Sequence, residues 1–204
     1  MSEVPGEHRA EIASRHLRAC RRFGQAVAAA AAAGRWSAPS PCPEWDARAV
    51  VEHVIGFHDV LLLRPMGAKP ERPKGDPAAR WEITHAALAA LFERPGLFDG
   101  PIDVPAVGNN PPTRIEAAPL VGLLSQDVLI HTWDLARAIG ADDRLDPDLC
   151  AYLCHRLPAD PSAQIRSGMF APPLDPPAGA DPQVVLLSRL GRDIGWQAPA
   201  GDRR

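Results

Sequence analysis

The segment from Leu120 to Gly140, LVGLLSQDVLIHTWDLARAIG, constrains the fold of this chain more than any other. Its apolar residues recur at three- and four-residue steps, which is the spacing of one face of an α-helix. Asp127 and His131 project together from the middle of this face, and Asp134 follows within one further turn. A carboxylate in an apolar seam is costly to bury unless it is paired or bound to a cation. The segment therefore predicts a buried helix with a polar centre.

Three further amphipathic segments, separated by stretches rich in proline and glycine, predict an all-α four-helix bundle. A short additional helix and an irregular C-terminal tail with one more short helix complete the expected fold. We expect residues 1–157 to form the bundle with its site and residues 158–204 to form an extension packed on the same domain. The expected elements are helices over 8–33, 47–63, 77–93, 115–140, 147–157 and 182–190, and a short strand over 102–104.

A second histidine makes a metal site more plausible than a simple hydrogen-bonded pair. Val50, His53 and Phe57 share one face of the second helix, whereas His58 points about 140° away from His53 at ~100° per residue. Helix bundles hold metals between facing helices, so His53 is expected to meet Asp127 and His131. On the residues alone, a pair that merely orients the helices remains the alternative.

Two nitrogens and one oxygen suit Zn²⁺ first, with Ni²⁺ or Fe²⁺ as alternatives, and leave coordination positions open for water or substrate. This is a catalytic rather than a structural arrangement. We expect His16 and His155 to be peripheral. Cys42 lies between two prolines and is either a small packed residue or an exposed thiol.

The charge and composition exclude several classes of partner. The net charge is −3 and no run of lysine or arginine is long enough to suggest nucleic acid, so we expect no nucleic-acid partner. No stretch approaches the ~20 apolar residues of a membrane span, and the N-terminus lacks a signal-peptide core. The four cysteines show no CxxC spacing, which favours a reduced, cytoplasmic protein.

Three motifs carry a resemblance that covers the chain from the first helix to Trp196. SPCPEWDARAVVEHVIG resembles the segment that leads into the second helix of actinobacterial DinB-like proteins, and QDVLIHTWDLARAIG resembles their fourth-helix motif. LLSRLGRDIGW is similar to the C-terminal signature of a metal-binding subgroup of this family. The family includes mycothiol-dependent maleylpyruvate isomerase.

The resemblance implies a four-helix DinB bundle in which His53, Asp127 and His131 hold a divalent metal. The isomerase differs from this chain in two respects. It has a glutamate at the position of Asp127, and its C-terminal domain is larger. The metal assignment therefore transfers to this sequence, whereas the isomerase substrate does not. Asp134 is expected to orient a ligand histidine by accepting its other N–H. Trp133 is expected to border the cofactor site, with ordinary helix packing as an equal alternative.

These features predict a metal-dependent, thiol-dependent transferase or isomerase. The metal would lower the pKa of a small-molecule thiol, of which mycothiol is the expected one, for attack on an electrophilic substrate. One alternative is a non-catalytic metal- or ligand-binding protein with a regulatory or stress role. Another is a hydrolase that uses a metal-activated water. The sequence leaves a homodimer open.

Overall fold

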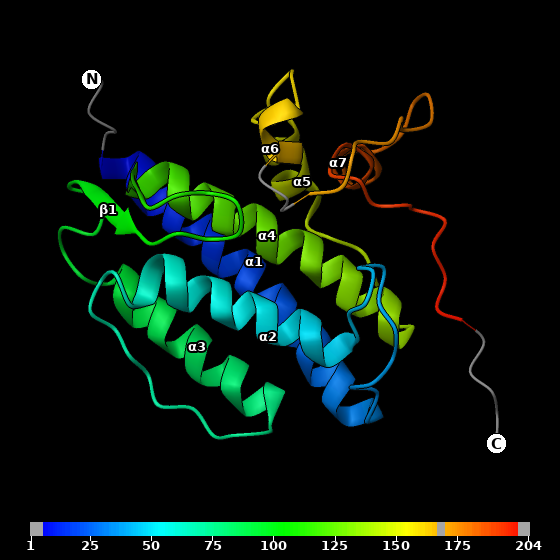
Figure 1. The fold of residues 1–204 in the computed structure, drawn as a ribbon, viewed down its shortest axis with the longest axis horizontal. Helices are drawn as coiled ribbons and strands as arrows, with labels where there is room; N and C mark the ends of the chain where they lie inside the picture. Colours follow the sequence, from blue (N-terminus) through cyan, green and yellow to red (C-terminus); the bar gives the residue numbers. More distant parts are fainter. Residues whose placement is uncertain (1–5, 167–169, 200–204) are drawn as a thin grey trace.

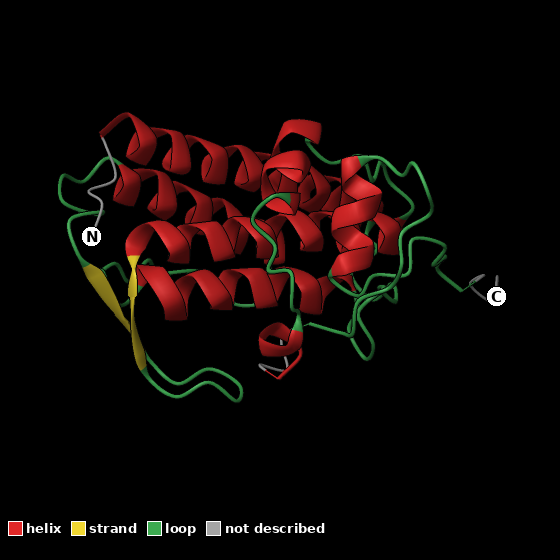
Figure 2. Cartoon of the chain, turned by 90° about the horizontal axis from the view of Figure 1, so that it is seen from above, coloured by secondary structure: helices red, strands yellow, loops and turns green. Residues whose placement is uncertain are grey.

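The protein is an all-α DinB-like four-helix bundle, as the sequence predicts, in a computed structural model that describes residues 6–166 and 170–199. The four long helices lie side by side (Figures 1 and 2). Both α1 and α2 pack against α3 and α4. In the described part of the chain, no helix combines the length and apolar character needed to cross a membrane. The bundle helices are α1 (Gly6–Ala33), α2 (Ala47–His58), α3 (Pro77–Phe92) and α4 (Ala117–Ile139).

Local signals in the sequence set the ends of these helices. The Asp46 carboxylate accepts the backbone N–H of Ala49 and caps α2. Asp76 caps α3 in the same way, and Pro77 occupies its first turn. Gly140 ends α4 in a left-handed conformation with φ of 70°. The loop over 64–76 runs back along the bundle, so α2 and α3 point in the same direction (Figure 1).

The second helix differs from the prediction near its C-terminal end. A regular helix to Leu63 was expected, but α2 ends at His58 and continues as one π-helical turn, η1 (Asp59–Leu63). Asp59 is buried there and accepts two hydrogen bonds from the guanidinium of Arg72, at 2.7 and 3.0 Å. This tertiary pair holds the turn against the following loop, and such pairing cannot be read from local periodicity.

A two-stranded antiparallel hairpin lies at one end of the bundle (Figure 2). Its strands are β1 (Pro101–Val104) and β2 (Thr113–Glu116), with Ile102 opposite Ile115. The predicted strand at 102–104 is confirmed. The predicted start of the fourth helix at Ile115 is wrong, because cross-strand pairing holds this residue in β2 and α4 begins two residues later.

Three short helices follow the bundle and appear above α4 in the view of Figure 1. They are α5 (Pro147–Cys154), α6 (Ser162–Arg166) and α7 (Pro182–Arg189). The helix α6 was not predicted from the sequence. Apolar residues of α5 and α7, including Leu149 and Leu186, belong to the same buried cluster as the bundle helices. The helix α7 therefore shares a buried apolar core with the bundle.

Gly191, two residues after α7, lies against residue 171. Its φ is +78°, and a Cβ there would lie 2.7 Å from backbone and side-chain atoms of Ala171. Left-handed strain costs about 1–2 kcal/mol in a non-glycine residue, and overpacking adds ~1–3 kcal/mol. We expect Gly191→Ala to lower the free energy of unfolding, measured in urea, by the sum of the strain and overpacking costs. Gly179→Ala is the matched control, because its φ is +74° but its Cβ would meet no described atom within 4 Å. Equal losses in both variants would contradict the close contact.

Candidate metal centre

His53 from α2 and Asp127 and His131 from α4 converge in the bundle interior. Asp127 Oδ1 lies 3.2 Å from His53 Nε2 and 3.4 Å from His131 Nε2. The two imidazole rings are 4.7 Å apart, centroid to centroid. Ligand atoms of one tetrahedral Zn²⁺ ion, with bonds of about 2.0–2.2 Å, lie roughly 3.3–3.5 Å apart. The three side chains therefore have the spacing of a ligand set.

Asp127 is the residue that most clearly fits a cation. Its side chain is 9% exposed, and its Oδ2 atom is buried without a hydrogen-bond partner among the described residues. Burial by itself would raise the pKa of this carboxyl. The charge of His131 and hydrogen bonds from both histidines outweigh burial and hold the pKa well below its usual range. An ionised, half-satisfied carboxylate beside two imidazoles is a donor set that suits a divalent ion.

The orientation of His131 is set by Asp134. His131 Nδ1 lies 2.9 Å from Asp134 Oδ2, and a carboxylate can only accept from it. Nδ1 therefore carries a hydrogen in either charge state of the ring. Nε2 donates to Asp127 when the ring is charged, and its lone pair becomes available to a metal ion when the ring is neutral. A carboxylate–histidine pair of this kind fixes the tautomer of metal-binding histidines.

Asp134 is itself fully buried and is neutralised by the C-terminal extension. The Arg192 guanidinium donates hydrogen bonds to both carboxylate oxygens at 2.8–3.2 Å, and the Cys42 thiol donates to Oδ2 at 3.1 Å. Burial would raise the pKa of Asp134, but the His131 hydrogen bond and the Arg192 charge lower it. Burial likewise opposes a charged His131, yet Asp127 and the hydrogen bonds to Asp134 and Cys42 raise its pKa well above the usual value.

A second set of three possible donors, Cys42, His131 and Asp134, lies in the same region. Arg192 Nη2 is 3.4 Å from Cys42 Sγ and 2.8 Å from Asp134 Oδ2, so one positive charge already occupies this side of His131. A metal ion there would be repelled by the guanidinium. The set around Asp127 is therefore the better cation site.

The centre opens into a cavity of about 670 Å³, the size range of small-molecule sites. Trp45 packs its ring 4.7 Å from the His53 ring and 5.7 Å from the His131 ring, centroid to centroid. The described lining residues are mostly apolar: Cys42, Pro43, Trp45, His53, Gly56, Phe57, Val60, Val107, Asp127, His131, Phe170, Ala171 and Arg192.

The structure thus brings four of the five residues singled out from the sequence to one place: His53, Asp127, His131 and Asp134. It does not bring Trp133 there, because this side chain is buried beneath Arg137 and is absent from the described residues that line the cavity. Of the two alternatives for Trp133, the structure shows helix packing.

Three residues at the site were missed by sequence reasoning, namely Cys42, Trp45 and Arg192. Each lies within one of the motifs that carry the family resemblance, so the motifs contained the signal. The first two belong to SPCPEW, and Arg192 belongs to LLSRLGRDIGW. Cys42 is buried, which favours the small packed residue over the exposed thiol.

A DinB-like bundle with a histidine–carboxylate centre between α2 and α4 is the class of protein that this fold and site define. The family model of the mycothiol maleylpyruvate isomerase N-terminal domain matches residues 17–136, more than half of the chain. The chain belongs to this family. The matched segment contains His53, Asp127, His131 and Asp134, whereas Arg192 lies beyond it.

Two curated relatives come from Mycobacterium tuberculosis: the uncharacterised protein MT0763 of strain CDC 1551 and the uncharacterised protein Rv0738 of strain H37Rv. Each is 32% identical over 184 residues, which cover 88% of this chain and 96% of the relative. The similarity therefore extends past the matched domain and includes at least part of the C-terminal extension. No solved structure matches the chain.

Proposed function

We propose that this protein is a divalent-metal-dependent enzyme that uses mycothiol or a related small thiol as co-substrate, in a transferase or isomerase reaction. The observation that carries the proposal is the set of His53, Asp127 and His131 in the lining of a mostly apolar cavity. The name of the family links it to mycothiol. In this reading the three residues hold the ion, Zn²⁺ being favoured by the ligand set, with Ni²⁺ or Fe²⁺ as alternatives.

The metal would supply Lewis-acid chemistry, lowering the pKa of a thiol so that the thiolate is available near neutral pH. The protein contributes the charge balance that makes this favourable. Asp134 and Arg192 neutralise each other, and Asp127 offsets one of the two charges of a divalent ion. The remaining positive charge is matched by one thiolate, so an anionic thiol binds without leaving a net charge in a buried site.

The surrounding residues position the reactants. Asp134 keeps the Nε2 lone pair of His131 aimed at the centre, and Trp45 restricts the movement of both imidazoles by packing on them. The apolar wall, which includes Phe57 and Val60, offers an electrophilic substrate a surface on which to pack. An apolar lining offers few hydrogen-bond partners that would position a hydrolytic water, which is why we prefer this function to a hydrolase.

Thiol titration of the metal-loaded protein tests the proposal. We expect mycothiol to release a proton near pH 7 and, in the Co²⁺-substituted protein, to give a thiolate-to-metal charge-transfer band, because a coordinated thiol ionises far below its usual pKa of ~8.5. Glutathione and bacillithiol are expected to give weaker signals.

The Asp127→Ala and His131→Ala variants should give neither signal, whereas His155→Ala, a change at an exposed residue, should behave as the wild type. If the loaded wild type shows no signal with any of the three thiols, thiol activation is wrong. A non-catalytic metal- or ligand-binding protein then becomes the better description.

A further inference from the structure

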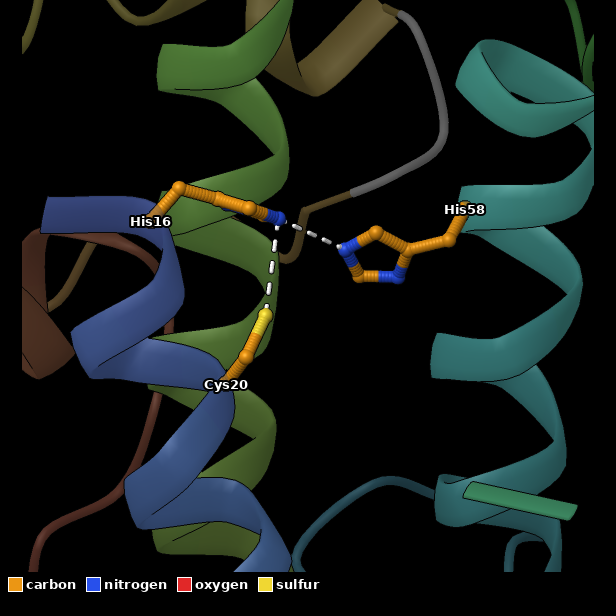
Figure 3. A group of neighbouring side chains, drawn as sticks. All are labelled: His16, Cys20 and His58. Carbon is orange, nitrogen blue, oxygen red and sulfur yellow. Dashed lines mark hydrogen bonds between the residues drawn. The ribbon is translucent and has the colours of Figure 1, made fainter. Parts of the chain in front are cut away.

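A second group of donor side chains lies buried between α1 and the end of α2. It consists of His16, Cys20 and His58, each 0% exposed. Figure 3 shows the three side chains pointing toward one another. His16 Nε2 lies 3.2 Å from His58 Nε2 and 3.5 Å from Cys20 Sγ. The expectation that His16 is peripheral is wrong, because it and Cys20 occupy successive turns of the inner face of α1.

The hydrogen on His58 is placed by the backbone. Its Nδ1 atom lies 2.7 Å from the carbonyl oxygen of Val54, which can only accept a hydrogen bond. Nδ1 therefore carries the hydrogen of the neutral ring. The lone pair of His58 is on Nε2 and faces His16.

The hydrogen on His16 is placed by Ser125 of α4. The Ser125 hydroxyl donates to the carbonyl of Val121 at 2.7 Å, so Oγ accepts from His16 Nδ1 at 3.0 Å. The lone pair of His16 is then also on Nε2. Two lone pairs face each other at 3.2 Å, and the single thiol hydrogen of Cys20 can satisfy only one of them.

A cation between the two rings would accept both lone pairs and so remove the repulsion between them. A proton is disfavoured, because burial lowers the pKa of both histidines. The observed separations are close to those of a metal site instead. For bonds of about 2.0–2.1 Å to nitrogen and ~2.3 Å to sulfur, two nitrogens lie roughly 3.3 Å apart in tetrahedral and roughly 3.6 Å apart in trigonal geometry, and a nitrogen and a sulfur lie roughly 3.6 and 3.8 Å apart. The side chains therefore need to move by only a few tenths of an ångström to bind an ion.

We propose that His16, Cys20 and His58 form a second, fully enclosed metal site for a thiophilic transition-metal ion. Two imidazole nitrogens and one thiolate suit copper and zinc, and they disfavour Mg²⁺ and Ca²⁺, which prefer oxygen. On binding, the thiol proton of Cys20 leaves to solvent, and the sulfur and both nitrogens each donate an electron pair to the ion.

Charge balance selects the ion. One thiolate neutralises Cu⁺, whereas Zn²⁺ would leave one uncompensated positive charge in a site without exposed surface, which is costly. The nearby carboxylates are already engaged. Asp127 belongs to the first centre, and Asp59 is paired with Arg72. The site is therefore expected to prefer Cu⁺ and to stabilise the bundle by tying α1 to α2.

This site is separate from the first centre. His53 and His58 lie on different faces of α2, and the described residues that line the cavity of the first centre include none of His16, Cys20 and His58. The inference therefore does not depend on the proposed function, and either one can fail without the other.

Metal loading of the full-length chain tests the site. Because no donor residue is exposed, the protein is unfolded in urea and refolded anaerobically with Cu⁺ or with Zn²⁺, then challenged with a chelator. The His131→Ala variant, whose first centre is disabled, should retain roughly one Cu⁺ per chain. Adding Cys20→Ser should lower Cu⁺ affinity at least ~10–100-fold. Adding Cys150→Ser, which removes another fully buried thiol, should not.

X-ray absorption of copper-loaded His131→Ala protein provides a readout that requires no change at Cys20. We expect one sulfur and two nitrogen neighbours. Copper retained equally by the Cys20→Ser and Cys150→Ser proteins, a copper shell without sulfur, or no copper after the chelator challenge would overturn the site. Tighter retention of Zn²⁺ than of Cu⁺ would overturn the choice of ion.

Discussion

The His131→Ala variant is expected to lose the metal of the first centre, with an affinity at least ~10–100-fold below that of the wild type. Changes to residues that only support a metal ligand already cost this much, and His131 Nε2 faces the centre directly. The loss is measured by metal analysis of the purified protein after dialysis against a competing chelator. The variant also leaves the Asp134 carboxylate without its histidine partner, so its fold is checked by circular dichroism.

Two comparisons make this result specific to the centre. The His155→Ala variant removes an exposed histidine and should keep its metal. An ion bound at Cys20 would remain in both variants, so their difference reports only the first centre. The Asp127→Asn variant keeps the shape of the side chain but removes its charge, and it should lose metal as His131→Ala does. Equal occupancy in His131→Ala and His155→Ala would refute the ligand assignment.

The Arg192→Met variant is expected to lower the free energy of unfolding by about 3–5 kcal/mol. Arg192 is the guanidinium that neutralises the fully buried Asp134, and removing one partner of a buried pair leaves the other charge uncompensated. Methionine keeps the apolar stem, so the loss reflects charge and hydrogen bonding. In a chain of this length the thermal midpoint should fall by roughly 10 °C.

Arg144→Ala is the control, because this arginine pairs with Asp142 on the surface, where ion pairs contribute little. The double variant Arg192→Met/Asp134→Asn should cost less than the sum of the single changes, since both charges are removed together. Because Arg192 lies in the extension, this experiment also tests whether residues 158–204 form one domain with the bundle. A stability of Arg192→Met within about 0.5 kcal/mol of the wild type would contradict both points.

Periodicity and capping predicted the four bundle helices to within a few residues, because both are local properties of the sequence. Asp46 and Gly140 mark helix ends through their own backbone and side-chain chemistry. The π-helical turn at Asp59 and the strand at Ile115 could not be predicted in this way. Each depends on a partner distant in the sequence, Arg72 in the first case and Ile102 in the second.

The site was predictable in part for the same reason. The four-residue spacing of Asp127 and His131 and the phase of His53 on its helix indicated which side chains share one space. Arg192 could not be placed by periodicity, because it follows a short helix in an irregular segment and reaches Asp134 across 58 positions.

The sequence also contains part of the pattern that forms the site of His16, Cys20 and His58. Cys20 lies within the first predicted helix, and His16 precedes it by four residues, which places both on one face. The apolar stripe of α1 alone does not identify His58 as their partner. That contact depends on how α1 crosses the end of α2, which only the folded structure shows.

Diffraction from metal-loaded crystals at the absorption edge of the ion tests the central claim most directly, because the anomalous signal locates the ion without reference to activity. We predict a peak about 2.0–2.2 Å from His53 Nε2, His131 Nε2 and a carboxylate oxygen of Asp127, on the side that faces the cavity. A peak on the Cys42 and Asp134 side of His131, or no peak at the three residues in fully loaded protein, would contradict it.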